Sequence, residues 1–306
     1  MRAVAVARCL PFFLMRMLDA NLPQGVTYLN VGHSNISERV FWAISQLPGS
    51  RVTVMVHDMI PLDFPQYQRA GTVEKFREKM KLVSQSADLV ICNSLDTRAA
   101  VARYFREWGR EPGMIVAHLA SATVSAVSKP EPRKTPYFVT LGTIEPRKNH
   151  AFLLDLWGDL RKELPDGELP DLYVVGARGW NNEDVFRRLD ALEPQSGITE
   201  LGDLDDAGVQ ALLEGASGLL APSLAEGYGL PLLEAAALDT PILANDLSVY
   251  REFLSDIPVY ASVNDRYLWA RTIRRMAVVR RAGDPEKKKT RLPSWDEHFN
   301  RVLKVT

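Results

Sequence analysis

The stretch PSLAEGYGLPLLE, residues 222–234, combines two glutamates with a glycine-rich turn where a predicted strand passes into a predicted helix. Gly227 and Gly229 allow the backbone to turn tightly, and Pro231 suits the first turn of a helix, where a missing N–H is tolerated. The free amides at the start of such a helix form an anion site that suits a diphosphate. The pattern therefore predicts a phosphate-binding turn.

Glu226 precedes this turn and Glu234 lies within the predicted helix, so both carboxylates can project into one cleft. One of them could contact a sugar and the other a ribose. A capped helix with solvated glutamates would explain a single carboxylate. Two glutamates separated by seven residues around Gly-Tyr-Gly-Leu-Pro favour a ligand-binding site instead.

Short apolar, β-branched runs alternate with longer segments of helical period from residue 51 onward, which indicates an α/β fold of parallel sheets covered by helices. We expect strands at 51–57, 87–93, 114–119, 137–142, 172–176, 198–201, 218–222, 241–244 and 258–261. We expect helices near 72–84, 96–108 and 265–281, with Ser94 as the cap of the second.

The chain of 306 residues is longer than one compact core usually is, so two domains are expected. The proline-rich, charged stretch 128–136 indicates a linker. We predict an N-terminal domain over 1–130, a C-terminal domain over 131–290 and a tail over 291–306 that packs back on the N-terminal domain. The two similar halves suggest nucleotide-binding-like domains that face one cleft.

Composition excludes several classes of protein. The 37 basic residues nearly balance the 38 acidic ones, so no overall field attracts DNA, and nucleic acid is not an expected partner. The 46% hydrophobic and 25% charged content is that of a globular protein. Cys9 and Cys92 are too few for a disulfide framework or a zinc site, which indicates a reducing compartment and a cytoplasmic location.

The N-terminal segment VARCLPFFLMRML, residues 6–18, is an apolar run preceded by Arg2 and interrupted by Arg16. It is shorter than the roughly 18 apolar residues needed to span a bilayer, and no signal-cleavage site is convincing. We expect a buried helix here. The alternative is an interfacial helix with basic flanks, which would make the protein peripheral at the inner face of the membrane.

Two further polar motifs follow predicted strands, where α/β sheets place ligand groups. Arg147 and Lys148 lie between a strand and a helix and could neutralise a diphosphate, although a solvated loop is the alternative. His57 and Asp58 close a strand in the first half, where a lone histidine is more often structural. No convincing Asp-x-Asp site occurs, so no metal is expected.

Residues 222–234 resemble the E-x7-E motif of the retaining glycosyltransferases of family 4, which have the GT-B fold of two Rossmann-like domains facing a cleft. Three other stretches come in the family's order: FVTLGTIEPRKNH at 138–150, LYVVGARGW at 172–180 and TELGDLD at 199–205. The resemblance covers roughly residues 26–280. It implies that the donor's nucleotide and diphosphate bind the C-terminal domain and that the acceptor approaches from the N-terminal domain.

The resemblance also implies roles for single residues. Glu234 matches the glutamate that holds the donor ribose, and Glu226 matches the one near the transferred sugar. Arg147 and Lys148 would stabilise charge on the leaving nucleotide, and His57 matches a histidine that approaches the donor sugar. Further donor contacts are implied at Tyr228, Gly229, Leu230, Gly142, Thr143, Gly176, Asp203 and Leu204. Many relatives carry an arginine at the position of Thr143, for which Arg147 is a candidate substitute.

The implied function is transfer of a hexose, with mannose favoured, from GDP-mannose or a UDP-sugar to a glycan or lipid-linked acceptor in polysaccharide biosynthesis. Retention at the anomeric carbon, without cofactor or metal, is expected. The glycine-rich loop that opens most relatives is missing, so the N-terminal domain is expected to be shortened. A nucleotide-sugar epimerase of similar fold and a truncated, non-catalytic nucleotide-binding remnant are the alternatives. A dinucleotide oxidoreductase is disfavoured because no G-x-G-x-x-G follows the first strands.

Overall fold

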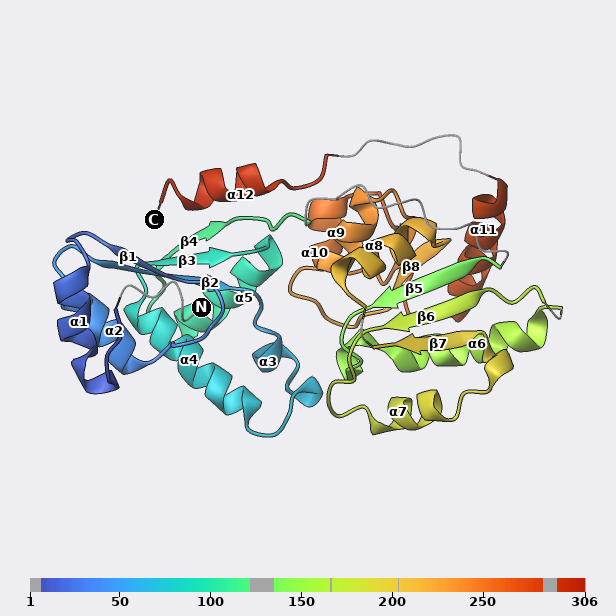
Figure 1. Cartoon of the computed structure of the whole chain (residues 1–306), viewed down its shortest axis with the longest axis horizontal. Coiled ribbons are helices and arrows are strands. Elements are labelled where there is room, and N and C mark those ends of the chain that lie inside the picture. Colours follow the sequence, from blue (N-terminus) through green and yellow to red (C-terminus); the bar gives the residue numbers. More distant parts are fainter. Residues whose placement is uncertain (1–6, 122–134, 166, 203, 283–290, 306) are drawn as a thin grey trace. The chain divides into compact units, whose positions relative to one another are not determined.

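The computed structural model describes residues 7–121, 135–165, 167–202, 204–282 and 291–305 (Figure 1). Its internal contacts divide the chain into two compact units. Unit 1 comprises Met1–Pro65, Ala70–His118 and Trp295–Thr306, and unit 2 comprises Gln66–Arg69 and Leu119–Ser294. The predicted linker at 128–136 lies almost entirely outside the described residues.

Unit 1 contains a parallel sheet of four strands in the order β1-β2-β3-β4. The strands are β1 (Thr27–Asn30), β2 (Arg51–Val56), β3 (Leu89–Cys92) and β4 (Gly113–Val116). Most residues of β2 and β3 are buried, as is usual where helices cover a parallel sheet. The three strands predicted in this half are confirmed, and each ends before its predicted last residue. β1 is an additional strand that the apolar pattern did not reveal.

Helices α2, α4 and α5 supply apolar side chains to the core of unit 1. The helices of this unit are η2 (Pro11–Phe13), α1 (Leu14–Asn21), α2 (Glu38–Ser45), α3 (Ile60–Asp63), α4 (Thr72–Ser86), α5 (Leu95–Glu107) and α12 (Trp295–Val302). The predicted cap of α5 is confirmed, because Ser94 Oγ accepts a hydrogen bond from the Thr97 N–H at 3.0 Å.

The N-terminal segment is not the buried helix that the sequence predicted. No residue of η2 or α1 is buried, and Phe12 is 93% exposed. The physical reason is the short length of the helix and its polar interruptions. Leu18 packs against the unit 1 core, whereas Arg16 and Asp19 are exposed.

The C-terminal tail is attached to unit 1 at the end of β4. The Arg301 guanidinium donates to the Val116 carbonyl at 2.8 Å, and His298 Nδ1 lies 3.1 Å from the His118 carbonyl oxygen. Val302 is buried at the end of α12. These contacts hold the last turns of the chain against the strand that precedes the crossing into unit 2.

Unit 2 contains a parallel sheet of six strands in the order β10-β9-β8-β5-β6-β7. The strands are β5 (Tyr137–Leu141), β6 (Asp171–Val175), β7 (Ile198–Leu201), β8 (Gly218–Ala221), β9 (Ile242–Ala244) and β10 (Val259–Tyr260). All six strands predicted in this half are confirmed. After β7 the chain returns to the opposite side of β5, so the sheet changes its direction of growth between β5 and β8.

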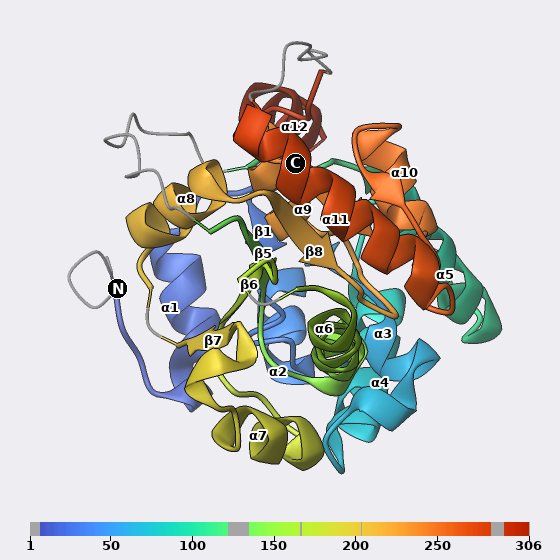
Figure 2. The same cartoon turned by 90° about the vertical axis from the view of Figure 1, so that its right-hand side faces the viewer.

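Alternate residues of these strands face two apolar clusters, one on each side of the sheet. Phe138 and Leu220 belong to the cluster that includes α6 and α11, and those two helices pack against each other (Figure 2). Val139 and Leu219 belong to the cluster that includes α8, α9 and α10. The helices of unit 2 are η4 (Pro146–Lys148), α6 (His150–Glu163), α7 (Glu183–Asp190), η5 (Pro194–Ser196), α8 (Asp206–Gly215), α9 (Leu230–Ala237), α10 (Ser248–Leu254) and α11 (Arg266–Ala282). The helix predicted at 265–281 is therefore confirmed as α11.

Candidate active site

Two loops at the carboxyl edge of the unit 2 sheet carry most of the predicted site residues. One follows β5 and contains Gly142, Thr143 and η4, and the other follows β8 and leads into α9. β5 and β8 are hydrogen-bonded neighbours, and the sheet changes direction between them. Open α/β sheets bind ligands outside the carboxyl ends of their strands at such a switch point.

Hydrogen bonds join these two loops. The Leu224 N–H donates to the Arg147 carbonyl at 2.8 Å, and the Asn149 side-chain amide donates to the Pro222 carbonyl at 3.3 Å. Asn149 has a φ of 58°, a left-handed conformation that asparagine adopts more readily than most residues. This turn ends η4 and leaves Arg147 and Lys148 beside the loop that follows β8.

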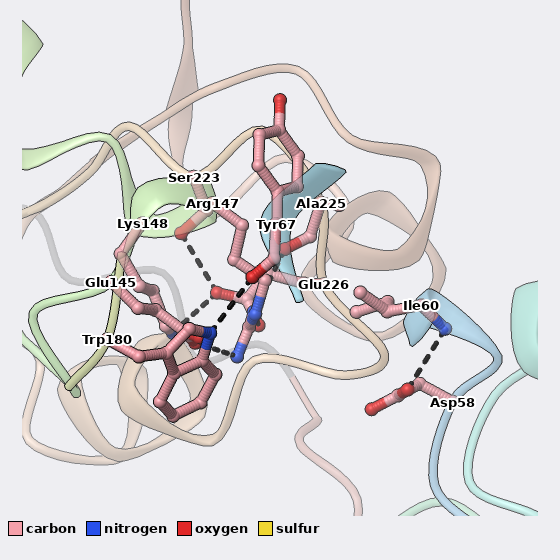
Figure 3. A network of polar contacts seen from close by, with 10 residues as sticks. All are labelled: Asp58, Ile60, Tyr67, Glu145, Arg147, Lys148, Trp180, Ser223, Ala225 and Glu226. Atoms are coloured by element: carbon pink, nitrogen blue, oxygen red, sulfur yellow. Dashed lines mark hydrogen bonds and ion pairs between the residues drawn. The ribbon is translucent and has the colours of Figure 1, made fainter. Parts of the chain in front are cut away.

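Glu226 lies at the centre of a buried charge cluster (Figure 3). Its Oε2 accepts a hydrogen bond from Arg147 Nη1 at 2.6 Å, and its Oε1 accepts one from Lys148 Nζ at 2.5 Å. The Ser223 hydroxyl donates to the same Oε1 at 2.9 Å. Only 8% of the Glu226 side chain is exposed. The structure thus brings together the two predicted cations and the glutamate predicted to lie near the sugar.

Two opposing effects act on the pKa of Glu226. Burial raises it, but the positive charges of Lys148 and Arg147 lower it by more, so the pKa lies below its ordinary value. Glu226 is therefore a carboxylate at neutral pH. It can accept hydrogen bonds and stabilise positive charge on a ligand, but it has no proton to donate.

Glu145 is a further member of the cluster that the sequence analysis did not identify. Its Oε1 lies 2.9 Å from Arg147 Nη2, and its side chain is 3% exposed. Burial raises its pKa, against the opposing charges of Arg147 and Lys148. The two carboxylates and two cations together carry no formal net charge. Glu145 stands two positions before Arg147, but this spacing alone does not tell which ion pairs form.

Three glycines let the loops after β5 and β6 lie against each other. Gly142 and Gly176 have φ values of 138° and 145°. A Cβ at Gly176 would lie 2.2 Å from the Gly142 carbonyl oxygen, and one at Gly142 would lie 3.2 Å from Lys148 Cε. A Cβ at Gly179 would lie 2.7 Å from Thr143 Cγ2. The structure therefore gives Thr143 a packing contact and places Gly142 directly against the Lys148 side chain.

The Gly-Tyr-Gly turn leads into α9 as the sequence predicted. Gly229 precedes the helix with a φ of 123°, and Pro231 occupies its first turn. A Cβ at Gly229 would lie 2.6 Å from Tyr250 Cε1, so this position has neither the conformation nor the space for a side chain. Leu230, the first residue of α9, is 39% exposed. The start of the helix is thus accessible beside the charge cluster.

Tyr228 was predicted to contact the donor, but its side chain faces the core of unit 2. The hydroxyl donates to the Leu119 carbonyl at 2.6 Å, and the ring stacks on Phe253 with a centroid distance of 4.3 Å. Its place in the buried apolar cluster that includes Phe253 and Leu232 explains this orientation. A donor contact at this position would have to come from the backbone.

Glu234, Leu204 and Asp203 are the remaining predicted donor-binding residues. Glu234 lies half-buried on α9, where burial and the charge of Asp206 raise its pKa. Leu204 is 38% exposed and precedes the Asp205 cap of α8. Asp203 lies outside the described residues.

His57 belongs to unit 1, at the carboxyl end of β2. Its Nε2 lies 2.7 Å from the Val31 carbonyl oxygen, so this nitrogen carries the proton, and its ring lies 5.4 Å from that of His33. Asp58 accepts a hydrogen bond from the Ile60 N–H at 3.0 Å (Figure 3). His33, which lies beside His57, is buried enough that its pKa falls to about 4.

The two helix-covered parallel sheets give the chain the GT-B fold of known glycosyltransferase structures. A crystal structure of the pneumococcal O-GlcNAc transferase GtfA in complex with UDP and GlcNAc has the same fold, with a TM-score of 0.61 and 15% identity, covering 87% of this chain and 51% of that one. The chain belongs to the family described as family 4 glycosyltransferases in conflict systems, whose model matches residues 11–305.

The curated relatives include mannosyltransferases. The serotype-specific mannosyltransferase WbdA of Escherichia coli is 30% identical over 234 residues, which cover 70% of this chain and 28% of WbdA. The O-antigen chain mannosyltransferase RfbU of Salmonella typhimurium is 25% identical over 227 residues, which cover 72% of this chain and 60% of RfbU. The chain therefore spans less than two thirds of the length of each of these relatives.

Proposed function

We propose that this chain transfers a hexose, with mannose favoured, from a nucleotide-sugar to a glycan or lipid-linked acceptor in polysaccharide biosynthesis, with retention at the anomeric carbon. One observation carries the proposal. Glu226 is held between Arg147 and Lys148 at the switch point of the sheet, next to the accessible start of α9.

The chemistry of such a site suits a sugar diphosphate. The diphosphate would bind at the start of α9, where backbone amides and the helix dipole favour anions. Arg147 and Lys148 would bind its oxygens and stabilise the charge that develops on the leaving nucleotide. Glu226 would then turn its carboxylate toward the hydroxyls and the positively charged ring of the departing sugar. Glu234 would hold the ribose.

Mannose is favoured because WbdA and RfbU are mannosyltransferases, which makes GDP-mannose the first donor to test. The UDP bound in the GtfA crystal structure makes UDP-sugars the second class. RfbU is described as an O-antigen chain mannosyltransferase, which supports a glycan or a lipid-linked acceptor. A cytoplasmic location is part of the proposal, because nucleotide-sugars would be available there. No metal is required in this proposal, because the two cations and the helix amides neutralise the diphosphate.

A peripheral contact with the inner face of the membrane is part of the proposal. In the described ranges of the chain, no helix is both long and apolar enough to cross a bilayer. Leu10, Phe12 and Phe13 are exposed, and the exposed Arg8 and Arg16 flank them. Apolar side chains beside arginines bind anionic lipid surfaces. Sedimentation with phosphatidylglycerol vesicles tests this contact, and a Phe12→Ser/Phe13→Ser variant that sediments like wild type would contradict it.

The activity is tested by release of nucleotide from GDP-mannose, UDP-glucose and UDP-GlcNAc, with an alkyl mannoside as acceptor and with water alone. Release that depends on acceptor, with a new α-linked product detected by NMR, is expected. Conversion of the donor to an isomeric nucleotide-sugar would instead identify an epimerase. Nucleotide binding without release or transfer would identify a non-catalytic remnant.

A further inference from the structure

Tyr250 on α10 is a buried tyrosine whose hydroxyl makes no hydrogen bond of good geometry within the described part of the chain, although Ser223 lies near enough to lower its pKa as a hydrogen-bonding group. The residue is 0% exposed. Buried polar groups in folded proteins are nearly always paired, and an unpaired one lowers stability. Phenylalanine would fill nearly the same volume without this cost in stability, so we expect the hydroxyl of Tyr250 to have a functional role.

The Tyr250 side chain lies beneath the turn that carries the proposed site. Its ring occupies the space that a Cβ at Gly229 would need, at 2.6 Å. The segment before α10 is tied to the same loop, because the Asn245 side-chain amide donates to the Ser223 carbonyl at 2.9 Å. Tyr250 therefore approaches the loop after β8 from the side opposite to solvent.

Apart from Tyr260, which raises the pKa of Tyr250 slightly, the side chains that act on this hydroxyl are Glu226, Ser223 and Arg147 at the charge cluster. Burial raises the pKa of Tyr250 well above its ordinary value, the negative charge of Glu226 raises it further, and Ser223 and Arg147 act in the opposite direction. The hydroxyl therefore keeps its proton. Ser223 already donates its own proton to Glu226 at 2.9 Å, so its oxygen remains able to accept one.

In the proposed function, Glu226 would lose hydrogen-bond donors when the diphosphate binds. In this structure Glu226 takes its hydrogen bonds from Arg147, Lys148 and Ser223. If a diphosphate binds the two cations, Ser223 is the donor of these three that stays with the buried carboxylate, and the loss of the others has a high cost in free energy. A second hydroxyl behind Ser223 would compensate for part of that loss.

We propose that Tyr250 is a positioning residue whose hydroxyl donates to Ser223 in the donor complex, so that Ser223 holds the Glu226 carboxylate ionised and directed toward the sugar. This assignment rests on the proposed glycosyl transfer. The order of donation runs from Tyr250 to Ser223 and from Ser223 to Glu226, and no proton leaves the chain of hydroxyls. Tyr250 itself does not touch the substrate.

The test compares Tyr250→Phe with Tyr137→Phe in the full chain. Tyr137 is the matched control because it is also buried in unit 2, but its hydroxyl donates to the Leu212 carbonyl at 2.9 Å. The measurements are the thermal midpoint of each protein and kcat for release of nucleotide from GDP-mannose and from UDP-glucose, as a function of pH.

We expect Tyr250→Phe to keep or raise the thermal midpoint while kcat falls about tenfold, which corresponds to about 1.4 kcal/mol in the barrier. The acid limb of its kcat profile should move to higher pH, because Glu226 loses hydrogen-bonding support for its charge. Tyr137→Phe should lower the midpoint and leave kcat unchanged.

Two results would overturn the assignment while leaving the proposed function intact. One is a Tyr250→Phe enzyme with the wild-type kcat and pH profile. The other is a Tyr250→Phe protein that loses as much stability as Tyr137→Phe, which would mean that the hydroxyl has a structural partner. Absence of turnover in the wild-type chain would overturn the proposed function itself, and this assignment with it.

Discussion

Replacing Glu226 with Gln tests the charge cluster directly, because it keeps the size of the side chain and removes its charge. Arg147 and Lys148 would each lose an ion pair, at 2.6 and 2.5 Å respectively. Their side chains are only 20% and 13% exposed, so water replaces these contacts poorly. The variant should therefore be less stable than wild type.

The size of the effect follows from burial. Removing one partner of a buried ion pair costs about 3 to 5 kcal/mol. The lower end applies here, because Arg147 keeps its contact with Glu145 at 2.9 Å. A loss of about 3 kcal/mol would lower the thermal midpoint by roughly 6 to 12 °C for a unit of this size.

The same substitution should strengthen binding of free nucleotide, since Glu226 competes with the diphosphate for the two cations. Two unit charges about 5 Å apart interact by roughly 3 kcal/mol at an effective dielectric constant of about 20. Solvent screening and movement of the side chains reduce this interaction energy, so we expect the affinity for GDP or UDP to increase about tenfold. Turnover should fall, because the contact with the sugar strengthens only in the transition state.

Urea unfolding, calorimetry with GDP and UDP, and nucleotide release measure the three effects. Glu163→Gln is the matched control, because Glu163 also pairs with an arginine, Arg274, but 58% of its side chain is exposed. The control should change stability by less than about 0.5 kcal/mol. A Glu226→Gln protein that is as stable as wild type and binds nucleotide more weakly would refute the reasoning.

Gly229→Ala should lose about 1 to 3 kcal/mol of unfolding free energy in urea, because the new Cβ would clash with the Tyr250 ring. The control Gly158→Ala lies in the interior of α6, with nothing within 4 Å of its Cβ, and should gain about 0.5 to 1 kcal/mol. Equal effects of the two substitutions would contradict the steric argument. Burial, followed by the charge of Lys148, lowers the pKa of His150 to about 4, below its unfolded value of about 6.5. The neutral form thus stabilises the fold fully above pH 6.5, and this contribution is lost as the pH falls toward 4, so His150→Gln should flatten the fall of unfolding free energy over that range. Transfer should survive EDTA, and loss of activity that Mn²⁺ or Mg²⁺ restores would show that a metal is needed.

The sequence by itself determined the class of fold and the position of the main loops. Alternation of apolar strands with helical segments identified all six strands of unit 2, because a buried parallel strand needs a continuous apolar run. The cap at Ser94 and the turn at Gly229 were also predictable, since hydrogen bonding to the next residues and a positive φ are local properties. Helix caps and tight turns depend on a few neighbouring residues, so a short stretch of sequence is enough to predict them.

Only the tertiary structure decided which of these residues meet. Glu226 pairs with Arg147 and Lys148 across 79 and 78 positions, and this depends on β5 lying beside β8. Sheet order is not visible in periodicity, because every buried parallel strand has the same apolar pattern. For the same reason the sequence did not show that Tyr228 faces the core, that Glu145 joins the cluster, or that the apolar side chains at Leu10 and Phe12 remain exposed. Whether each of these side chains is buried or exposed depends on how elements distant in the sequence pack against it.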